Sequence, residues 1–343
     1  MMRNCLMNKD AGRNIGKNIG ALRKVISHHI SKKRHPLAVT FVITYRCNLR
    51  CSYCNMWNIK DREMTAEEIF SMVDQFANMG TRRFGITGGE PLLRPDIKEI
   101  IDYAKGKEMI VTLQTNGWLV KDNISKLKNL DLLLLSFDGP PEVHDLNRQK
   151  GSHDKVIEAI KTARKNNIKI WANTTITKFN LGHINYILDT AMSLGFKLLF
   201  QPVMYYPLAS AGKEQIDAIS PPIEEYQDFI CKLMKKRKEK NSPILNSSTY
   251  LRFIMNLNRK RTFKECFAGK LYVAVSPSGN VAPCFFLVER QGWLNGKEHG
   301  FKKAVSGMPR FACQGCFCSA VNESDYFYRF NPEVVYNMLT KFL

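Results

Sequence analysis

An α/β fold built on a parallel sheet is predicted by two observations. Six apolar, β-rich segments lie between about residues 37 and 205, and segments with amphipathic helical periodicity separate them. Consecutive βα units with apolar strands are typical of a parallel sheet that helices cover. Six such units fit either a doubly wound sheet or a partial barrel, and periodicity does not decide between the two.

The predicted elements alternate regularly along this region. Strands are expected over 38–45, 83–87, 109–115, 131–137, 168–177 and 196–203. Helices are expected over 65–79, 95–105, 121–129, 152–166, 181–194 and 222–239. The first helix begins with a capping box from Thr65 to Glu68, and its apolar stripe consists of Ile69, Met72, Val73 and Phe76. In both architectures ligands bind at the carboxyl ends of the strands.

The regular alternation of predicted strands and helices ends at about residue 240. Residues 241–262 are polar and basic, and we interpret them as a linker or a solvated helix. A hairpin is expected around Ser276 to Asn280, within a region of short strands and turns. The predicted regions are a basic arm (1–35), an α/β core (36–230), a basic helix or linker (231–262), a small α+β domain (263–325) and a C-terminal helix (326–343).

The net charge of +20 is concentrated in two of these regions. Residues 1–35 contain nine Lys and Arg against one Asp, a net charge of +8, and residues 232–264 contain eleven against one Glu, a net charge of +10. A domain that coats nucleic acid spreads its basic residues over a broad face, so nucleic-acid binding is disfavoured. We see no apolar signal segment and no apolar run near the roughly 20 residues that span a bilayer, so we expect a cytoplasmic protein.

The basic arm has two interpretations. Ile15, Ile19, Leu22, Ile26 and Ile30 form a helical stripe with basic residues around it. A basic amphipathic helix can lie on an anionic membrane surface, which predicts peripheral membrane contact. The alternative is a helix that packs on the base of the α/β core with its charges in water.

Three of the ten cysteines lie directly after the first strand. Cys47, Cys51 and Cys54 have the spacing C-x3-C-x2-C. Grouped cysteines in a reducing compartment indicate metal rather than disulfides. A four-iron cluster bound by three thiolates keeps one iron without a protein ligand, which gives a substrate or cofactor a place to bind. A catalytic zinc also uses three protein ligands, but the intervening residues contain no His or carboxylate.

This segment resembles the signature of the radical S-adenosylmethionine (SAM) superfamily, in which an aromatic residue, here Tyr53, precedes the last cysteine. TGGEPLLRP at 87–95, LQTNG at 113–117, SFDGP at 136–140 and GSHDKVIEAI at 151–160 resemble further elements of the family in the expected order. The resemblance covers about residues 38–205. It implies a partial (β/α)6 radical SAM barrel.

The resemblance also implies a set of site residues. Cys47, Cys51 and Cys54 would hold a [4Fe–4S] cluster whose open iron binds SAM. The implied SAM-binding residues are Tyr53, Gly88, Gly89, Glu90, Thr115, Asn116, Ser136, Asp138 and Asn173. Among them, the two glycines would let the backbone approach the methionine moiety, and Ser136 and Asp138 would face the ribose. Taken alone, Ser136 and Asp138 also fit a strand-end cap, and Asn173 also fits a residue that satisfies backbone groups.

A second cysteine group lies in the small α+β domain. Cys266, Cys284, Cys313 and Cys316 resemble the ligands of the auxiliary-cluster domain called twitch, a short relative of SPASM. The resemblance implies a second [4Fe–4S] cluster that assists electron transfer, with Cys318 as a spare or alternate ligand. A zinc ion on the same four thiolates remains the alternative.

The implied activity is reductive cleavage of SAM to a 5′-deoxyadenosyl radical, which abstracts hydrogen from a substrate. We expect a small, anionic or membrane-derived substrate, and an external one-electron reductant of the flavodoxin or ferredoxin type. A peptide maturase with a separate recognition partner is the first alternative, because only 46 residues precede Cys47 and an embedded peptide-recognition domain does not fit there. A metal-stabilised nucleic-acid binder is the second.

Overall fold

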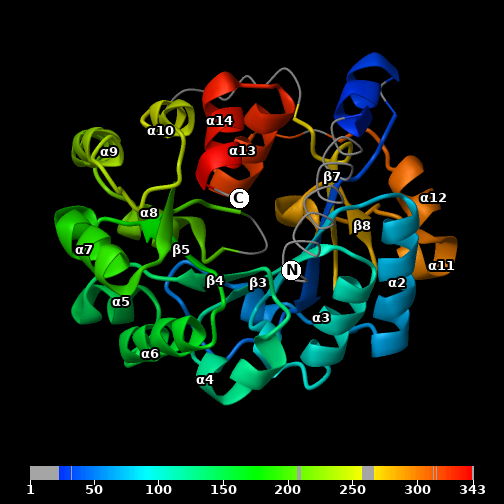
Figure 1. Ribbon diagram of the computed structural model, residues 1–343, viewed down its shortest axis with the longest axis horizontal. Coiled ribbons are helices and arrows are strands. Elements are labelled where there is room, and N and C mark those ends of the chain that lie inside the picture. The colour runs from blue at the N-terminus through cyan, green and yellow to red at the C-terminus, as the bar shows by residue number, and fades with distance from the viewer. Residues whose placement is uncertain are drawn as a thin grey trace, which may run out of the picture.

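Eight strands form one curved sheet in the computed structural model (Figure 1). It describes residues 23–31, 33–206, 210–256, 266–311, 313 and 315–341. The strand order is β6-β5-β4-β3-β2-β1-β7-β8. The first six strands are β1 (Ala38–Thr44), β2 (Arg83–Gly88), β3 (Ile110–Thr115), β4 (Leu132–Ser136), β5 (Ile170–Ile176) and β6 (Lys197–Pro202). All five pairings among them are parallel and sequential, so the chain forms a partial barrel rather than a doubly wound sheet.

Helices cover the outer face of the curved sheet (Figure 1). They are α2 (Ala66–Asn78), α3 (Ile97–Gly106), α4 (Val120–Asn123), α5 (Pro141–Asn147), α6 (Ser152–Lys165) and α7 (Ile184–Leu194). The predicted capping box begins α2, and the predicted stripe of that helix is buried. The prediction of one continuous helix over 121–129 was wrong in its extent and type. The chain forms the short α4, which a 3-10 helix, η3 (Ile124–Leu127), follows.

The C-terminal part of the chain continues the same sheet. β7 (Tyr272–Val275) pairs in parallel with β1, and β8 (Val281–Ala282) pairs antiparallel with β7, which forms the predicted hairpin. The helices of this part are α8 (Lys213–Ile219), α9 (Ile223–Arg237), α10 (Ser248–Ile254), α11 (Gly296–His299), α12 (Phe301–Ser306), α13 (Ser319–Tyr328) and α14 (Pro332–Lys341). Residues 241–262 are therefore not simply a linker, since α10 buries Tyr250, Leu251 and Ile254. Residues 257–265 lie outside the described residues.

The described part of the basic arm packs on the amino-terminal edge of the sheet. Residues 23–31 are helical. Lys24 Nζ donates to the carbonyls of Met79 and Gly80 at 2.8 and 2.9 Å, just before β2 begins. Val25 and His28 are buried, whereas Ile26 and Ile30 of the predicted stripe are 44% and 80% exposed. These contacts favour packing on the core; Ile15, Ile19 and Leu22 lie outside the described residues.

Among the described residues, no helix combines the length and the apolar character that crossing a membrane requires.

Candidate active site

The three-cysteine loop follows β1 at the carboxyl edge of the sheet. The amide of Leu49 donates to Cys47 Sγ at 3.4 Å, and the amide of Cys54 donates to the Cys51 carbonyl at 3.1 Å. Burial raises the pKa of all three thiols, and that of Cys51 reaches about 11. The electrostatic influence of Cys51 on Cys47, and of Cys54 on Cys51, adds to this rise. Metal-free, the loop therefore carries neutral thiols, and a bound cation must displace their protons.

The end of β2 packs directly against this loop. The amide of Gly89 donates to the Thr44 carbonyl, and the amide of Glu90 donates to the Arg46 carbonyl, both at 2.8 Å. A Cβ on Gly89 would lie 2.3 Å from the Arg46 carbonyl oxygen and 2.5 Å from that of Tyr45. Glycine is therefore needed here so that β2 can approach the cysteine loop, whatever ligand binds.

Glu90 connects the loop to β3. Its buried carboxylate accepts hydrogen bonds from Thr115 Oγ1 at 2.8 Å and from the amides of Asn116 and Leu92 at 3.0 Å. Burial raises the pKa of Glu90 to about 7. Asn116 Nδ2 in turn donates to Asn48 Oδ1 at 2.9 Å, inside the cysteine loop. Three predicted site residues thus lie in one hydrogen-bonded group beside Cys47.

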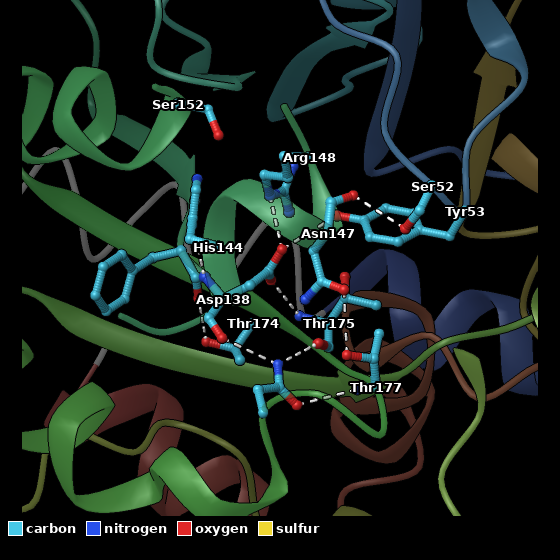
Figure 2. A network of polar contacts seen from close by, with 12 residues as sticks. Ser52, Tyr53, Asp138, His144, Asn147, Arg148, Ser152, Thr174, Thr175 and Thr177 are labelled. Carbon is cyan, nitrogen blue, oxygen red and sulfur yellow. Dashed lines mark hydrogen bonds and ion pairs between the residues drawn. The ribbon is translucent and has the colours of Figure 1, made fainter. Parts of the chain in front are cut away.

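A buried ion pair forms the other side of the site (Figure 2). Arg148 Nε donates to Asp138 Oδ2 at 2.7 Å, and the two side chains are 8% and 0% exposed. Burial alone would lower the pKa of Arg148, but the Asp138 carboxylate raises it above its usual range. Tyr53 OH donates to the same Asp138 oxygen at 3.3 Å, and the guanidinium lies 5.5 Å from the Tyr53 ring centroid.

Asp138 is also held from the β5 side. Its Oδ1 accepts from the amide of Thr175 at 2.9 Å, and its own amide donates to His144 Nδ1 at 3.1 Å. Burial lowers the pKa of His144 well below its ordinary value, so the imidazole is neutral and can accept this bond. Asp138 therefore organises the carboxyl ends of β4 and β5, and Arg148 is a site residue that sequence reasoning missed.

Ser136 and Asn173 are register partners on β4 and β5. Ser136 is 7% exposed, and Asn173 Oδ1 is buried without a hydrogen-bond partner in the described part of the chain. The chain therefore brings eleven of the twelve predicted residues of the first site to the carboxyl ends of β1 to β4, and the twelfth, Asn173, lies beside Ser136 in the middle of β5.

The second cysteine group gathers around Cys284. Burial raises the pKa of Cys284 well above its usual value, and the nearby thiols of Cys316, Cys266 and Cys313 raise it further. The four proposed auxiliary ligands therefore lie in one neighbourhood. Within the described ranges, no three His, Cys, Asp or Glu side chains are placed closely enough to bind a single metal ion.

Tyrosines surround this second group. Cys266 Sγ lies 3.0 Å from Tyr272 OH, which also donates to Asp325 Oδ1 at 3.3 Å. Burial raises the pKa of Cys266 to about 12, and the Asp325 carboxylate contributes. Burial likewise raises the pKa of Tyr206, with further contributions from Cys316 and Cys318. Cys318 therefore lies near Tyr206, as do Cys316 and Cys284.

The segment around Tyr206 connects the two cysteine groups. Ser210 forms an antiparallel bridge with Cys54, and the amide of Ala211 donates to the Tyr53 carbonyl at 3.2 Å. Ser210 Oγ accepts from the amide of Tyr206 at 2.8 Å. The Tyr206 ring stacks on Phe286, two residues after Cys284, with centroids 3.9 Å apart. These contacts join the segment that follows Cys54 to the segment that follows Cys284.

Comparison with known proteins identifies the fold and the family. A family described as "Radical SAM superfamily" matches residues 41–191. The AdoMet-dependent heme synthase of Methanosarcina barkeri is 27% identical over 299 residues, which cover 80% of this chain and 83% of the relative. The antilisterial bacteriocin subtilosin biosynthesis protein AlbA of Bacillus subtilis is 26% identical over 323 residues, which cover 85% of this chain and 69% of AlbA.

Solved structures agree on the fold. The crystal structure of Streptococcus suis SuiB bound to S-adenosylmethionine superposes with a TM-score of 0.69 at 17% identity, covering 84% of this chain and 69% of SuiB. At this identity the likeness concerns the fold alone. The partial barrel, the three-cysteine loop after its first strand and the family match lead to one conclusion: residues 41–191 of this chain form a radical SAM domain.

Proposed function

We propose that this chain binds a [4Fe–4S] cluster through Cys47, Cys51 and Cys54 and uses it to cleave SAM. The observation that carries the proposal is the set of three half-buried thiols on one loop, between the Glu90 group and the Asp138–Arg148 pair. Three soft donors without a fourth suit a cluster with one open iron. When bound, cluster and SAM supply a 5′-deoxyadenosyl radical that abstracts hydrogen from the substrate.

The chain's own residues prepare this site in two ways. Glu90 presents a carboxylate held by three donors, which suits the ammonium group of SAM. Tyr53 is held by Asp138 and Arg148, so its ring has a fixed position beside Cys51 and Cys54. The buried ion pair and the neutral His144 exclude water from this wall, which protects a reactive radical.

We further propose a second [4Fe–4S] cluster on Cys266, Cys284, Cys313 and Cys316. The mutual influence of these thiols on Cys284 supports it. Four thiolates would satisfy such a cluster and keep substrate from binding it, which favours electron transfer. The aromatic contacts of Tyr206 place this second group close to the first.

The proposed substrate is a small molecule, with a peptide as the second candidate. The name of the heme synthase relative supports the first, and the name of the bacteriocin biosynthesis protein supports the second. The packed arm gives a membrane-derived substrate no support from the described residues.

Anaerobic reconstitution tests the proposal. About eight irons per chain are expected, corresponding to two clusters. Dithionite and SAM should then yield 5′-deoxyadenosine. A full iron content without 5′-deoxyadenosine would contradict the proposed activity, and about one zinc per chain would favour a structural metal site. Deuterated candidate substrates that pass label into 5′-deoxyadenosine would identify the substrate.

A further inference from the structure

A small cavity lies between the β7–β8 hairpin and the segment that follows the three-cysteine loop. Its volume is about 200 Å³, below the roughly 300–1,000 Å³ of sites for drug-sized molecules. Ser276 lines the cavity and directly follows β7, which runs parallel to β1, so the cavity lies at the carboxyl edge of the sheet. Parallel α/β folds bind their ligands at this edge. The other polar side chains of the lining include Lys60, Asp61, Asn280, Glu289 and Arg290.

Hydrogen bonds between these segments hold the walls of the cavity in place. Ser278 Oγ donates to Asp61 Oδ2 at 2.7 Å, which joins the hairpin turn to the segment after the cysteine loop. The amide of Asn280 donates to Ser276 Oγ at 3.1 Å, and Asn280 Oδ1 accepts from Asn295 Nδ2 at 3.1 Å. The hydroxyl and amide groups of the walls are thus bonded within the protein, so a ligand need not order them.

Glu289 is the most informative side chain of the cavity. Its Oε1 is buried and has no hydrogen-bond partner among the residues that the structure describes. Burial raises the pKa of Glu289 to about 7, and the charges of Lys60, Asp61 and Arg290 do not contribute to this shift. A buried acceptor without a donor is unfavourable, and so is a buried carboxylate without a cation beside it. A ligand that supplies both a donor and a positive charge would remove both penalties.

We propose that this cavity binds a small molecule through a primary ammonium group, for which Glu289 is the acceptor and the counter-charge. An ammonium has three N–H donors and a localised positive charge, which suit a carboxylate with an unsatisfied oxygen. Glu289 is half-buried, and its carboxyl group turns about a bond with a broad torsional well, so either oxygen can face the cavity. The hydroxyl and amide walls suit a ligand whose remaining groups are also polar.

Two other kinds of occupant fit the lining less well. Calcium takes six to eight oxygen ligands, and in the described ranges no three His, Cys, Asp or Glu side chains lie close enough to share a metal ion. A small anion could contact Lys60 and Arg290, but the carboxylates of Glu289 and Asp61 line the same cavity and would repel it.

Three two-carbon probes that differ in one group test the proposal. Ethanolamine carries an ammonium where ethylene glycol carries a hydroxyl and glycolate carries a carboxylate. Saturation-transfer NMR measures the affinity of each probe for the reconstituted protein in the absence of SAM. Glu289→Gln removes the charge while keeping the shape of the side chain. Glu224→Gln makes the same change at an exposed position on α9 and is the matched control.

Ethanolamine should bind the natural protein more tightly than ethylene glycol or glycolate by about tenfold or more at about pH 8. Glu289→Gln should weaken ethanolamine binding by about tenfold or more, while Glu224→Gln stays within about twofold of the natural protein. The ethanolamine affinity of the natural protein should also fall about tenfold from about pH 8 to about pH 6, because Glu289, whose pKa is about 7, becomes protonated while the ammonium keeps its charge. Glu289→Gln should abolish this pH dependence.

Equal ethanolamine affinity in Glu289→Gln and Glu224→Gln would overturn the proposal, and so would the absence of saturable ethanolamine binding to the natural protein. Tighter binding of glycolate than of ethanolamine would overturn it in favour of an anion site at Lys60 and Arg290. If Glu289→Gln does not fold, the pH profile of the natural protein decides, and a constant affinity would contradict the proposal. These measurements use no SAM, so they are independent of whether the chain cleaves it.

Discussion

The two cysteine groups of this chain are built in opposite ways. The first takes three thiols from residues 47–54 of a single loop, directly after β1. Charged side chains face it, namely Glu90, Asp138 and Arg148. The second takes its thiols from separate segments between residues 266 and 316. Tyrosines surround that group: Tyr250 and Tyr272 are buried and Tyr206 is half-buried, and one buried carboxylate, Asp325, lies beside Tyr272.

The difference indicates a division of labour. Charged and hydrogen-bonding groups beside the first site suit a polar, charged ligand that must be oriented, as SAM is. At the second site, four proposed thiolate ligands would leave no iron open to a ligand, which favours a centre that only gains and loses electrons. We therefore expect changes in the two regions to have different consequences.

Removing each cysteine set should give the largest and most contrasting effects. Cys47→Ala/Cys51→Ala/Cys54→Ala should lose about four irons and all SAM cleavage, because these three thiols are the proposed ligands of the SAM-binding cluster. Cys266→Ala/Cys284→Ala should also lose about four irons but keep dithionite-driven SAM cleavage. Iron analysis and 5′-deoxyadenosine chromatography measure both. Loss of SAM cleavage in the second variant, with four irons retained, would contradict the division of labour.

Replacing Asp138 by Asn should destabilise the first region strongly. It leaves the Arg148 guanidinium buried without a counter-charge, which costs about 3–5 kcal/mol of unfolding free energy. Asp228→Asn, on the exposed face of α9, is the control and should change stability by less than about 0.5 kcal/mol. Denaturant titration of the metal-free proteins measures both. Equal stability of the two variants would mean that the ion pair is not needed.

Gly89→Ala should disturb the first cysteine loop by a smaller amount. The added Cβ meets two carbonyl oxygens of that loop, so backbone must shift at a cost of about 1–3 kcal/mol. We expect lower iron occupancy of the first site and normal occupancy of the second. Gly106→Ala is the control, because a Cβ there meets nothing within 4 Å. A fully occupied first site in Gly89→Ala would show that the packing of β2 tolerates a methyl group.

Tyr272→Phe should have the smallest effect, confined to the second region. It removes the hydroxyl that lies 3.0 Å from Cys266 Sγ. Hydrogen bonds to ligand sulfurs stabilise the reduced form of a cluster, so the reduction potential of the second centre should become more negative. Electron paramagnetic resonance during a redox titration measures this, with the first centre in the same sample as the control. An unchanged second potential would place Tyr272 outside the centre's influence.

Local sequence patterns were sufficient to predict much of this fold. The capping box and apolar stripe of α2 appear as predicted, because helix initiation depends on neighbouring residues. The cysteine loop could also be predicted from the sequence, since all three thiols lie within residues 47–54. Arg148 was not, because its partner Asp138 is ten residues away and only burial makes the pair significant.

Long-range packing accounts for the remaining differences. The pairing of β7 with β1 joins strands more than two hundred residues apart, and no periodicity encodes it. In the described part of the arm, the predicted apolar stripe is not the packed face: Ile26 and Ile30 are exposed, and the helix packs through Val25 and His28. Tertiary contacts selected that face. The His28 ring packs edge-on against Phe267, and His29 Nε2 is hydrogen-bonded to the Tyr328 carbonyl.

The seventh parallel strand has a mechanical consequence. β1 leads straight into one set of thiols, and its backbone ladder to β7 ties it to the hairpin that leads into Cys284. No hinge can open between partners in a continuous ladder without breaking it. The spacing between the two proposed cluster sites is therefore set once, when the chain folds, and electron transfer between the proposed clusters would need no movement of the protein.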